Sequence, residues 1–281
     1  MGSRRYALYP FIGEGIFTQD GLSWKHSREM LRRPFLRIHY QDLKGFGEHV
    51  DSLITKLSAS EGVVDLQPHF FRFTLATTTA LIFGQPVESL ENETQDTFAS
   101  SFDHASWISS LRTRLQDLYW VYNPKRYRVS CQTVKAFAGG LVKQALRENA
   151  EKSEAGNSNG YAFIRDLYDE LHDSVLVRDQ LVNVLLAGRD TTACLLSWTL
   201  SVKSYIRVAQ ATFKPSCHAD QSRTSFLLVR NPQTLSRLSA EIQSVMGDAE
   251  DITRASVQKM TYLKCILNES TRAILPCTML P

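Results

Sequence analysis

The feature that most constrains the fold is a long, mostly apolar stretch from Leu181 to Leu200. A run of this length is long enough to cross a bilayer as a helix. Its centre, however, holds Arg189 and Asp190, and the middle of a membrane disfavours each of these charges by several kcal/mol. We therefore predict a buried helix of a soluble protein at this position.

The polar centre of this helix is the hexapeptide A-G-R-D-T-T at 187–192. Burying an acid and an alcohol is costly unless they face a polar cavity or one another. Because glycine inside a helix costs about 1 kcal/mol relative to alanine, Gly188 indicates a close approach or a kink. Together these features predict a helix opened to admit a small polar ligand or waters. Alternatively, the two threonines bond back to helix carbonyls while Arg189 and Asp190 form an ordinary surface pair.

Most of the remaining sequence has helical periodicity and little strand alternation, which predicts a mainly α fold. Hydrophobic residues make up 43% of the chain, enough for one sizeable core. The polar, glycine-containing segment 153–160 is a predicted loop. The expected helices are Asp20 to Pro34, Gln41 to Leu57, Pro68 to Gly84, Glu91 to Tyr122, Tyr127 to Ala150, Tyr161 to Leu171 and the long one that follows Asp173.

The segment 201–225 differs from its surroundings. It has no sustained apolar stripe, contains Pro215 and interrupts a strong helix. Without it, LLSWTL would join FLLVRNPQ, and the apolar helix would run on to a natural stop at Asn231-Pro232. We interpret the segment as a non-native insert, from a retained intron or a mispredicted exon. The alternative is a genuine surface loop, although long structureless loops inside compact domains are uncommon.

Two spaced pairs carry weaker signals. Trp24 and Arg28 lie four residues apart on the basic predicted helix, so an indole N–H and a guanidinium can reach the same carboxylate. Glu269 and Arg272 lie three apart and can pair on one helical face. Either pair by itself is most often a surface contact worth a few tenths of a kcal/mol.

Charge and cysteine content exclude several classes of protein. The net charge of +3 is too small and too dispersed to indicate nucleic-acid binding. The five cysteines are widely spaced and include no C-x-x-C pair, which disfavours a disulfide framework or a zinc site. They are Cys131, Cys194, Cys217, Cys265 and Cys277.

The series W-x-x-x-R, A-G-x-D-T-T and E-x-x-R, on separate predicted helices, resembles the cytochrome P-450 family of haem-thiolate monooxygenases. The resemblance implies that Trp24 and Arg28 contact a haem propionate. It places Ala187 and Gly188 in the cofactor-binding, oxygen-binding groove, and it makes Asp190 and Thr191 catalytic residues that deliver protons for O–O cleavage. Glu269 and Arg272 would form a structural core pair beneath the haem.

Phrases such as GEGIFTQDG, DLYWVYNPK and LLAGRDTTACLLSW are most similar to the fungal branch that hydroxylates alkanes and fatty acids. The resemblance therefore implies a long-chain alkane or fatty acid as substrate. It also implies O₂, haem iron as cofactor and an NADPH-dependent reductase as partner. Full-length members of the family reside at the endoplasmic reticulum membrane.

The 281 residues also depart from the family pattern, because no F-x-x-G-x-R-x-C-x-G loop occurs among them. We expect a partial cytochrome P-450 fold over 1–281 that lacks the amino-terminal sheet region, the membrane anchor and the carboxy-terminal haem-thiolate loop. With no proximal cysteine and hence no metal ligand, haem binding by this chain is doubtful, and we expect it to be inactive, soluble or misfolded in the cytoplasm. The alternative is a non-enzymatic helical fragment or pseudogene product, at most a lipid- or haem-binding module.

Overall fold

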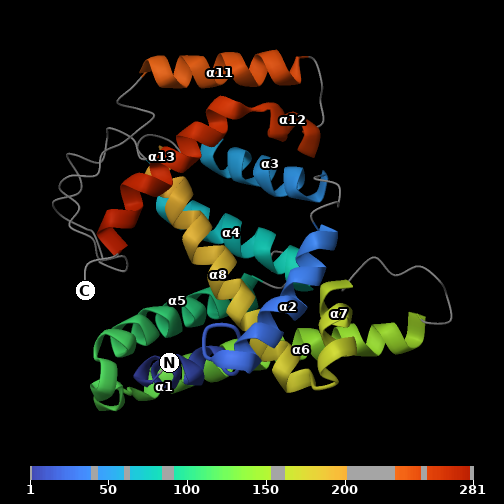
Figure 1. Cartoon of the computed structure of the whole chain (residues 1–281), viewed down its shortest axis with the longest axis vertical. Helices are drawn as coiled ribbons and strands as arrows, with labels where there is room; N and C mark the ends of the chain where they lie inside the picture. Colours follow the sequence, from blue (N-terminus) through green and yellow to red (C-terminus); the bar gives the residue numbers. More distant parts are fainter. Residues whose placement is uncertain are drawn as a thin grey trace. The chain divides into compact units, whose positions relative to one another are not determined.

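The structure is a computed structural model that describes residues 2–38, 44–59, 64–83, 92–152, 162–200, 232–247 and 252–278. The predicted insert 201–225 lies outside the described residues. Within the described ranges the secondary structure is helical with no strand, which confirms the predicted mainly α class. The elements are α1 (Ser3–Ile12), α2 (Gly21–Ile38), α3 (Lys44–Ser58), α4 (Leu66–Phe83), α5 (Asn92–Arg114), the 3₁₀ helix η2 (Gln116–Val121), α6 (Lys125–Lys152), α7 (Ala162–Leu171), α8 (Ser174–Leu200), α11 (Pro232–Met246), α12 (Arg254–Lys259) and α13 (Thr261–Thr278) (Figure 1).

The chain forms two compact units. The first unit comprises 1–41 and 74–189, and the second comprises 42–73 and 190–281. Helices α4 and α8 each contribute one part to the first unit and one part to the second. The division of α8 falls inside the A-G-R-D-T-T hexapeptide, between Arg189 and Asp190.

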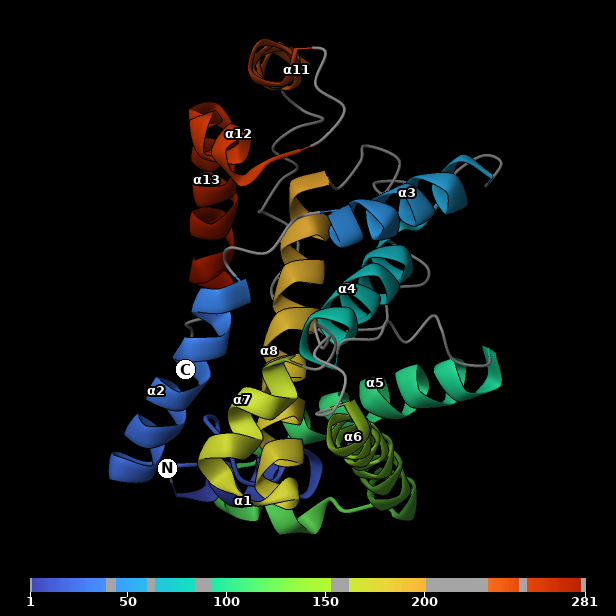
Figure 2. The ribbon, with the colours of Figure 1, turned by 90° about the vertical axis from the view of Figure 1, so that its right-hand side faces the viewer.

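The core of the first unit is built from amphipathic helices that share their apolar faces. Helix α1 packs on α5 and α6, α5 packs along α6, and α2 packs on α7 (Figure 2). Aromatic rings join these helices: the rings of Phe11 and Phe102 meet edge to face at 5.1 Å, and those of Phe98 and Phe137 lie 4.1 Å apart. Such pairs each contribute roughly 0.5–1.5 kcal/mol beyond the burial of their surface.

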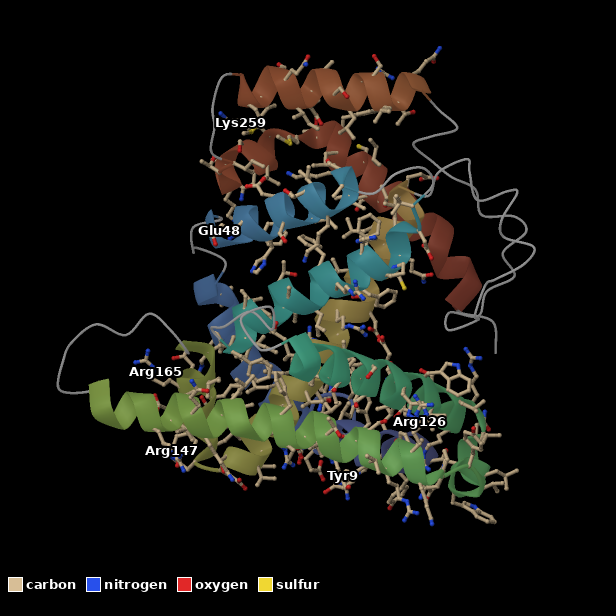
Figure 3. The ribbon with its side chains drawn as sticks, turned by 180° about the vertical axis from the view of Figure 1, so that it is seen from behind. Tyr9, Glu48, Arg126, Arg147, Arg165 and Lys259 are labelled. Atoms are coloured by element: carbon tan, nitrogen blue, oxygen red, sulfur yellow. The ribbon has the colours of Figure 1, made fainter. Side chains whose placement is uncertain are left out.

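Helix α6 illustrates how the charge is distributed. Tyr127 and Val134 on its inner face are fully buried. Arg126 and Arg147, near its two ends, are exposed, and Figure 3 labels their side chains. This pattern is typical of a surface helix that packs on one side, so the exposed basic residues of α6 need only water as their partner and do not indicate a binding site.

Two predicted boundaries are wrong. Helix α2 does not stop at Pro34 but includes it, with the ring buried, and continues to Ile38. The expected helix from Glu91 to Tyr122 is divided, because α5 ends at Arg114 and η2 begins at Gln116, which takes a positive φ of 48°. A left-handed residue cannot continue an α-helix, so the chain turns there.

In the second unit, Phe46 of α3 and Phe73 of α4 meet edge to face at 5.7 Å. Helix α11 supplies a cap for α13: the carboxylate of Glu241 accepts the backbone N–H groups of Tyr262 at 2.8 Å and Leu263 at 2.9 Å. Burial raises the pKa of Glu241, but these hydrogen bonds to its charged form outweigh burial and the net pKa is lowered. The N-terminus of α13 is therefore held by a carboxylate from another helix.

Candidate functional site

Gly188 lies where α8 meets α4 within the first unit. A Cβ built on Gly188 would lie 3.0 Å from Cγ2 and 3.2 Å from Oγ1 of Thr78. Contacts this short are tighter than side chains normally tolerate, so a larger residue at 188 would force the side chain of Thr78 to shift by a few tenths of an ångström. The close approach predicted from a glycine inside a helix is therefore present, and Thr78 is its partner. Ala187 beside it is half-buried.

Arg189 is buried, with 3% of its surface exposed. Its Nη2 lies 2.5 Å from Oδ1 of Asp103 on α5, and its guanidinium lies 5.1 Å from the ring centre of Phe102. A planar guanidinium suits such a place because it can pair with a carboxylate and stack on an aromatic face at once. The alternative that Arg189 belongs to an ordinary surface pair is therefore wrong. Arg189 instead joins the middle of α8 to α5 through the ion pair with Asp103 and the contact with Phe102.

Asp190 and Thr191 continue α8 into the second unit. The side chain of Asp190 is half-buried, whereas Thr191 and Thr192 are exposed. Further along the same helix, Ser197 and Thr199 donate hydrogen bonds back to backbone carbonyls. The predicted role of Asp190 and Thr191 in proton delivery stays a prediction.

Trp24 and Arg28 lie together on the outer face of α2. The guanidinium carbon of Arg28 is 5.5 Å from the centre of the Trp24 ring, and both side chains are exposed. The predicted proximity is therefore present. Whether the two side chains bind one carboxylate of a ligand stays a prediction.

Glu269 and Arg272 both lie in α13. Glu269 is exposed at the helix surface, and the neighbouring Ser270 is buried. The side chain of Arg272 lies outside the described residues. Their spacing places both residues on one face of α13, and the predicted pairing stays a prediction.

Comparison with known proteins identifies the family. The family model described as cytochrome P-450 matches residues 3–202 and 225–280. Cytochrome P-450 52A12 of Debaryomyces hansenii is 37% identical over 97% of this chain and 51% of its own length. Cytochrome P-450 52A6 of Candida tropicalis is 34% identical over 97% and 50%, and a cytochrome P-450 of Arthroderma benhamiae is 36% identical over 93% and 49%.

The chain belongs to the cytochrome P-450 family. It spans about half the length of the curated relatives it matches. Within the described ranges, no helix combines the length and hydropathy needed to span a membrane.

Haem is the cofactor of this family. Within the first unit, the exposed Trp24 and Arg28 have the kind of donors that a haem propionate would need. Two of the three described cysteines, Cys131 and Cys265, are poor candidates for the thiolate. Burial raises the pKa of Cys131 to about 11, so at neutral pH it remains a protonated thiol. Cys265 is exposed on α13 and lacks the glycine-rich loop of a haem ligand.

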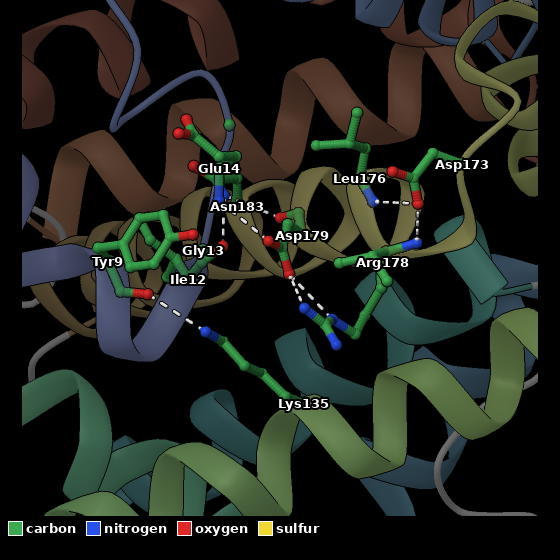
Figure 4. Close-up of polar contacts among 12 residues, drawn as sticks. Tyr9, Ile12, Gly13, Glu14, Lys135, Asp173, Leu176, Arg178, Asp179 and Asn183 are labelled. Carbon is green, nitrogen blue, oxygen red and sulfur yellow. Dashed lines mark hydrogen bonds and ion pairs between the residues drawn. The ribbon is translucent and has the colours of Figure 1, made fainter.

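Sequence reasoning missed one polar cluster, in which buried side chains of α8 hold the loop between α1 and α2 (Figure 4). Its local signal was the G-E-G of residues 13–15, which marks an unusual backbone without indicating what approaches it. Asn183 at the centre of the cluster is fully buried.

The buried thiol of Cys131 leads to a prediction about alkaline stability. Its folded pKa of about 11 lies above its ordinary value of 9.0, so the folded state favours the protonated thiol. By linkage, the stability that comes from keeping this thiol protonated is fully present below pH 9. As the pH rises toward 11, the free energy of unfolding falls by about 2–3 kcal/mol at most. Urea unfolding between pH 8 and 11 should therefore show a steeper loss in the wild type than in Cys131→Ala. Equal slopes in the two proteins would contradict this assignment.

Proposed function

We propose that the chain is part of a monooxygenase that hydroxylates long-chain alkanes or fatty acids. The oxidant is O₂, and an NADPH-dependent reductase supplies the electrons. The observation that carries the proposal is the order of W-x-x-x-R on α2, A-G-x-D-T-T on α8 and E-x-x-R on α13 in a chain of this family. Similarity to proteins named cytochrome P-450 52A over 97% of the chain supports the choice of branch. As a full-length enzyme it would reside at the endoplasmic reticulum membrane.

In this proposal the residues have separate roles. Trp24 and Arg28 bind a haem propionate, Ala187 and Gly188 belong to the oxygen-binding groove, and Glu269 pairs with Arg272 to hold the fold. Asp190 and Thr191 hold and pass protons. Bound haem supplies the iron that activates oxygen. A half-buried carboxylate next to an exposed hydroxyl supports this role, because such an acid can deliver protons without being fully exposed to water.

The proposal is tested on the enzyme in its full-length form, with reductase and NADPH, by mass spectrometry of the products from dodecanoate and hexadecane. Hydroxylation at or near the terminal carbon is the expected result. Turnover of neither substrate, with haem bound and the iron reducible, would overturn the substrate class. Failure to bind haem would overturn the enzymatic proposal itself.

We also propose that 201–225 is not part of the native fold. Two observations support this: the family model leaves 203–224 unmatched, and a helix runs through Leu200 up to the segment. Joining residue 200 to residue 226 would continue the apolar pattern to Asn231-Pro232.

Deleting 201–225 should therefore raise the soluble yield and the helical circular dichroism signal, because one uninterrupted apolar helix replaces an interrupted one. A control with 153–160 deleted, a polar segment of the predicted loop, should gain nothing. Lower yield and helicity in the first variant would show that 201–225 is a structural element. Sequencing the transcript across this region provides an independent check.

A further inference from the structure

The first half of α8 carries buried polar side chains at Asp179, Gln180 and Asn183. Each is at most 4% exposed. Buried polar groups cost free energy unless they are hydrogen-bonded, so their partners indicate their role. Apart from Arg178 and the carbonyl of Asp179 on α8 itself, those partners lie in residues 12–27, which end α1, lead into α2 and begin α2.

Asn183 and Asp179 hold the loop that precedes α2 (Figure 4). The amide of Asn183 donates to the carbonyl of Ile12 at 2.9 Å and accepts the N–H of Phe17 at 3.1 Å. The carboxylate of Asp179 accepts the N–H of Glu14 at 3.0 Å and pairs with Arg178 at 2.6 Å. Asp179 and Asn183 lie one turn apart, so they form a single clamp on one face of α8.

The loop backbone fits against this clamp only because it carries glycine. A Cβ at Gly13 would lie 2.0 Å from Oδ2 of Asp179, and a Cβ at Gly15 would lie 2.4 Å from Nδ2 of Asn183. Gly13 also has a φ of +65°, which other residues rarely adopt. Thr18 completes the turn, since its hydroxyl donates to the carbonyl of Gly13 and accepts the N–H of Gly15.

Gln180 contacts α2 directly. Its Nε2 donates to Oγ of Ser27 at 2.7 Å, and Ser27 donates to Oε1 of Gln19 at 2.5 Å. Ser27 immediately precedes Arg28 and follows Trp24 by three residues. Because each residue turns a helix by about 100°, holding Ser27 against α8 fixes the rotation of α2 about its axis. That rotation determines the direction in which Trp24 and Arg28 project.

We propose that Gln180 and Ser27 are positioning residues for the Trp24–Arg28 pair, and that the Asp179–Asn183 clamp sets where α2 begins. The inference rests on the proposed function, in which that pair binds a haem propionate. Gln180 lies on α8, the helix that carries A-G-R-D-T-T, and it would orient the W-x-x-x-R pair on α2 although it belongs to neither motif. The Oε1 of Gln180 is buried and accepts no hydrogen bond from the described residues, so Gln180 is retained at a cost to stability.

The test uses the double variant Ser27→Ala/Gln180→Met. Replacing both partners of a buried hydrogen bond with apolar groups is nearly neutral for stability. Gln19, which loses the hydrogen bond from Ser27, is only partly buried, so the urea midpoint should change little. The haem-free protein is titrated with hemin and with hemin dimethyl ester, which lacks charged propionates. We expect the preference for hemin over its ester to fall by about tenfold, because a misdirected guanidinium loses much of a charge-assisted hydrogen bond.

The matched control is Ser109→Ala/Tyr127→Phe. It removes another buried hydrogen bond of the first unit, with 3.0 Å between the two hydroxyl oxygens. Its preference for hemin should equal that of the wild type. Arg28→Leu, which removes the propionate contact itself, should lose the preference.

The outcomes separate the two proposals. Suppose Arg28→Leu loses the preference for hemin. The positioning role is then overturned if Ser27→Ala/Gln180→Met keeps that preference, or if it weakens the binding of hemin and of the ester equally. If Arg28→Leu keeps the preference, the propionate role in the proposed function is wrong. The claim that Gln180 and Ser27 hold α2 in place is then tested by amide hydrogen exchange over 21–28. Faster exchange in the double variant supports that claim, and unchanged exchange overturns it.

Discussion

Replacing Thr191 with alanine in the haem-loaded enzyme is expected to uncouple NADPH consumption from hydroxylation. Thr191 is exposed, follows the half-buried Asp190 and lies one turn beyond Ala187. A positioned proton donor typically contributes 10²–10⁴-fold to a rate, so we expect product formation to fall by about 10²-fold or more. Electrons would still be consumed, and hydrogen peroxide should replace the hydroxylated product. Alanine is the best helix former, so α8 and haem binding should be preserved.

The measurement is product and hydrogen peroxide per NADPH consumed. Thr192→Ala is the control, because Thr192 is equally exposed but is rotated about 100° from Thr191 around the helix. It should resemble the wild type. Unchanged product and peroxide yields in Thr191→Ala would show that the hydroxyl serves only the helix, and would remove the catalytic assignment.

The parts of the fold that the sequence predicts well are those determined by local periodicity. Helix α8 and its polar centre follow from one apolar run with charges in its middle. The contact between Trp24 and Arg28 follows from their spacing on a helix. What the pair binds does not follow from spacing, and the propionate role is implied by the resemblance to a family.

Elements that depend on distant partners were not predictable. The hydrogen bonds from Asp179 and Asn183 to the loop before α2 join residues 165 to 171 positions apart, so no local pattern announces them. Proline likewise misled the prediction at Pro34. A proline removes one hydrogen bond from a helix, and in α2 the buried ring provides packing that offsets this loss.

The polar centre of α8 shows why pattern and context must be combined. Arg189 and Asp190 are adjacent, and on sequence grounds either could face solvent. Only the fold shows that Arg189 points to Asp103 and Phe102 on α5 and is buried, while Thr191 and Thr192 are exposed. The residue between Gly188 and Asp190 is thus structural. Because Arg189 is buried, the free energy of unfolding should depend on its contacts with Asp103 and Phe102.

Phe102→Ala is therefore expected to be the most destabilising of these substitutions. The ring is fully buried, meets Phe11 edge to face and lies beneath the guanidinium of Arg189. Truncating a buried phenylalanine to alanine typically costs 3–5 kcal/mol, because transfer free energy is lost and a cavity remains.

Phe102→Leu keeps most of the volume and should cost less than about 2 kcal/mol. Trp107→Ala serves as the control on the same helix, since Trp107 is 45% exposed and should cost no more than about 1 kcal/mol. The measurement is urea-induced unfolding followed by circular dichroism. Equal losses for Phe102→Ala and Trp107→Ala would contradict the packing of α5 against α1 and α8. The Phe102 ring would then not be what stabilises the buried guanidinium of Arg189, and the burial of that charge would need another explanation.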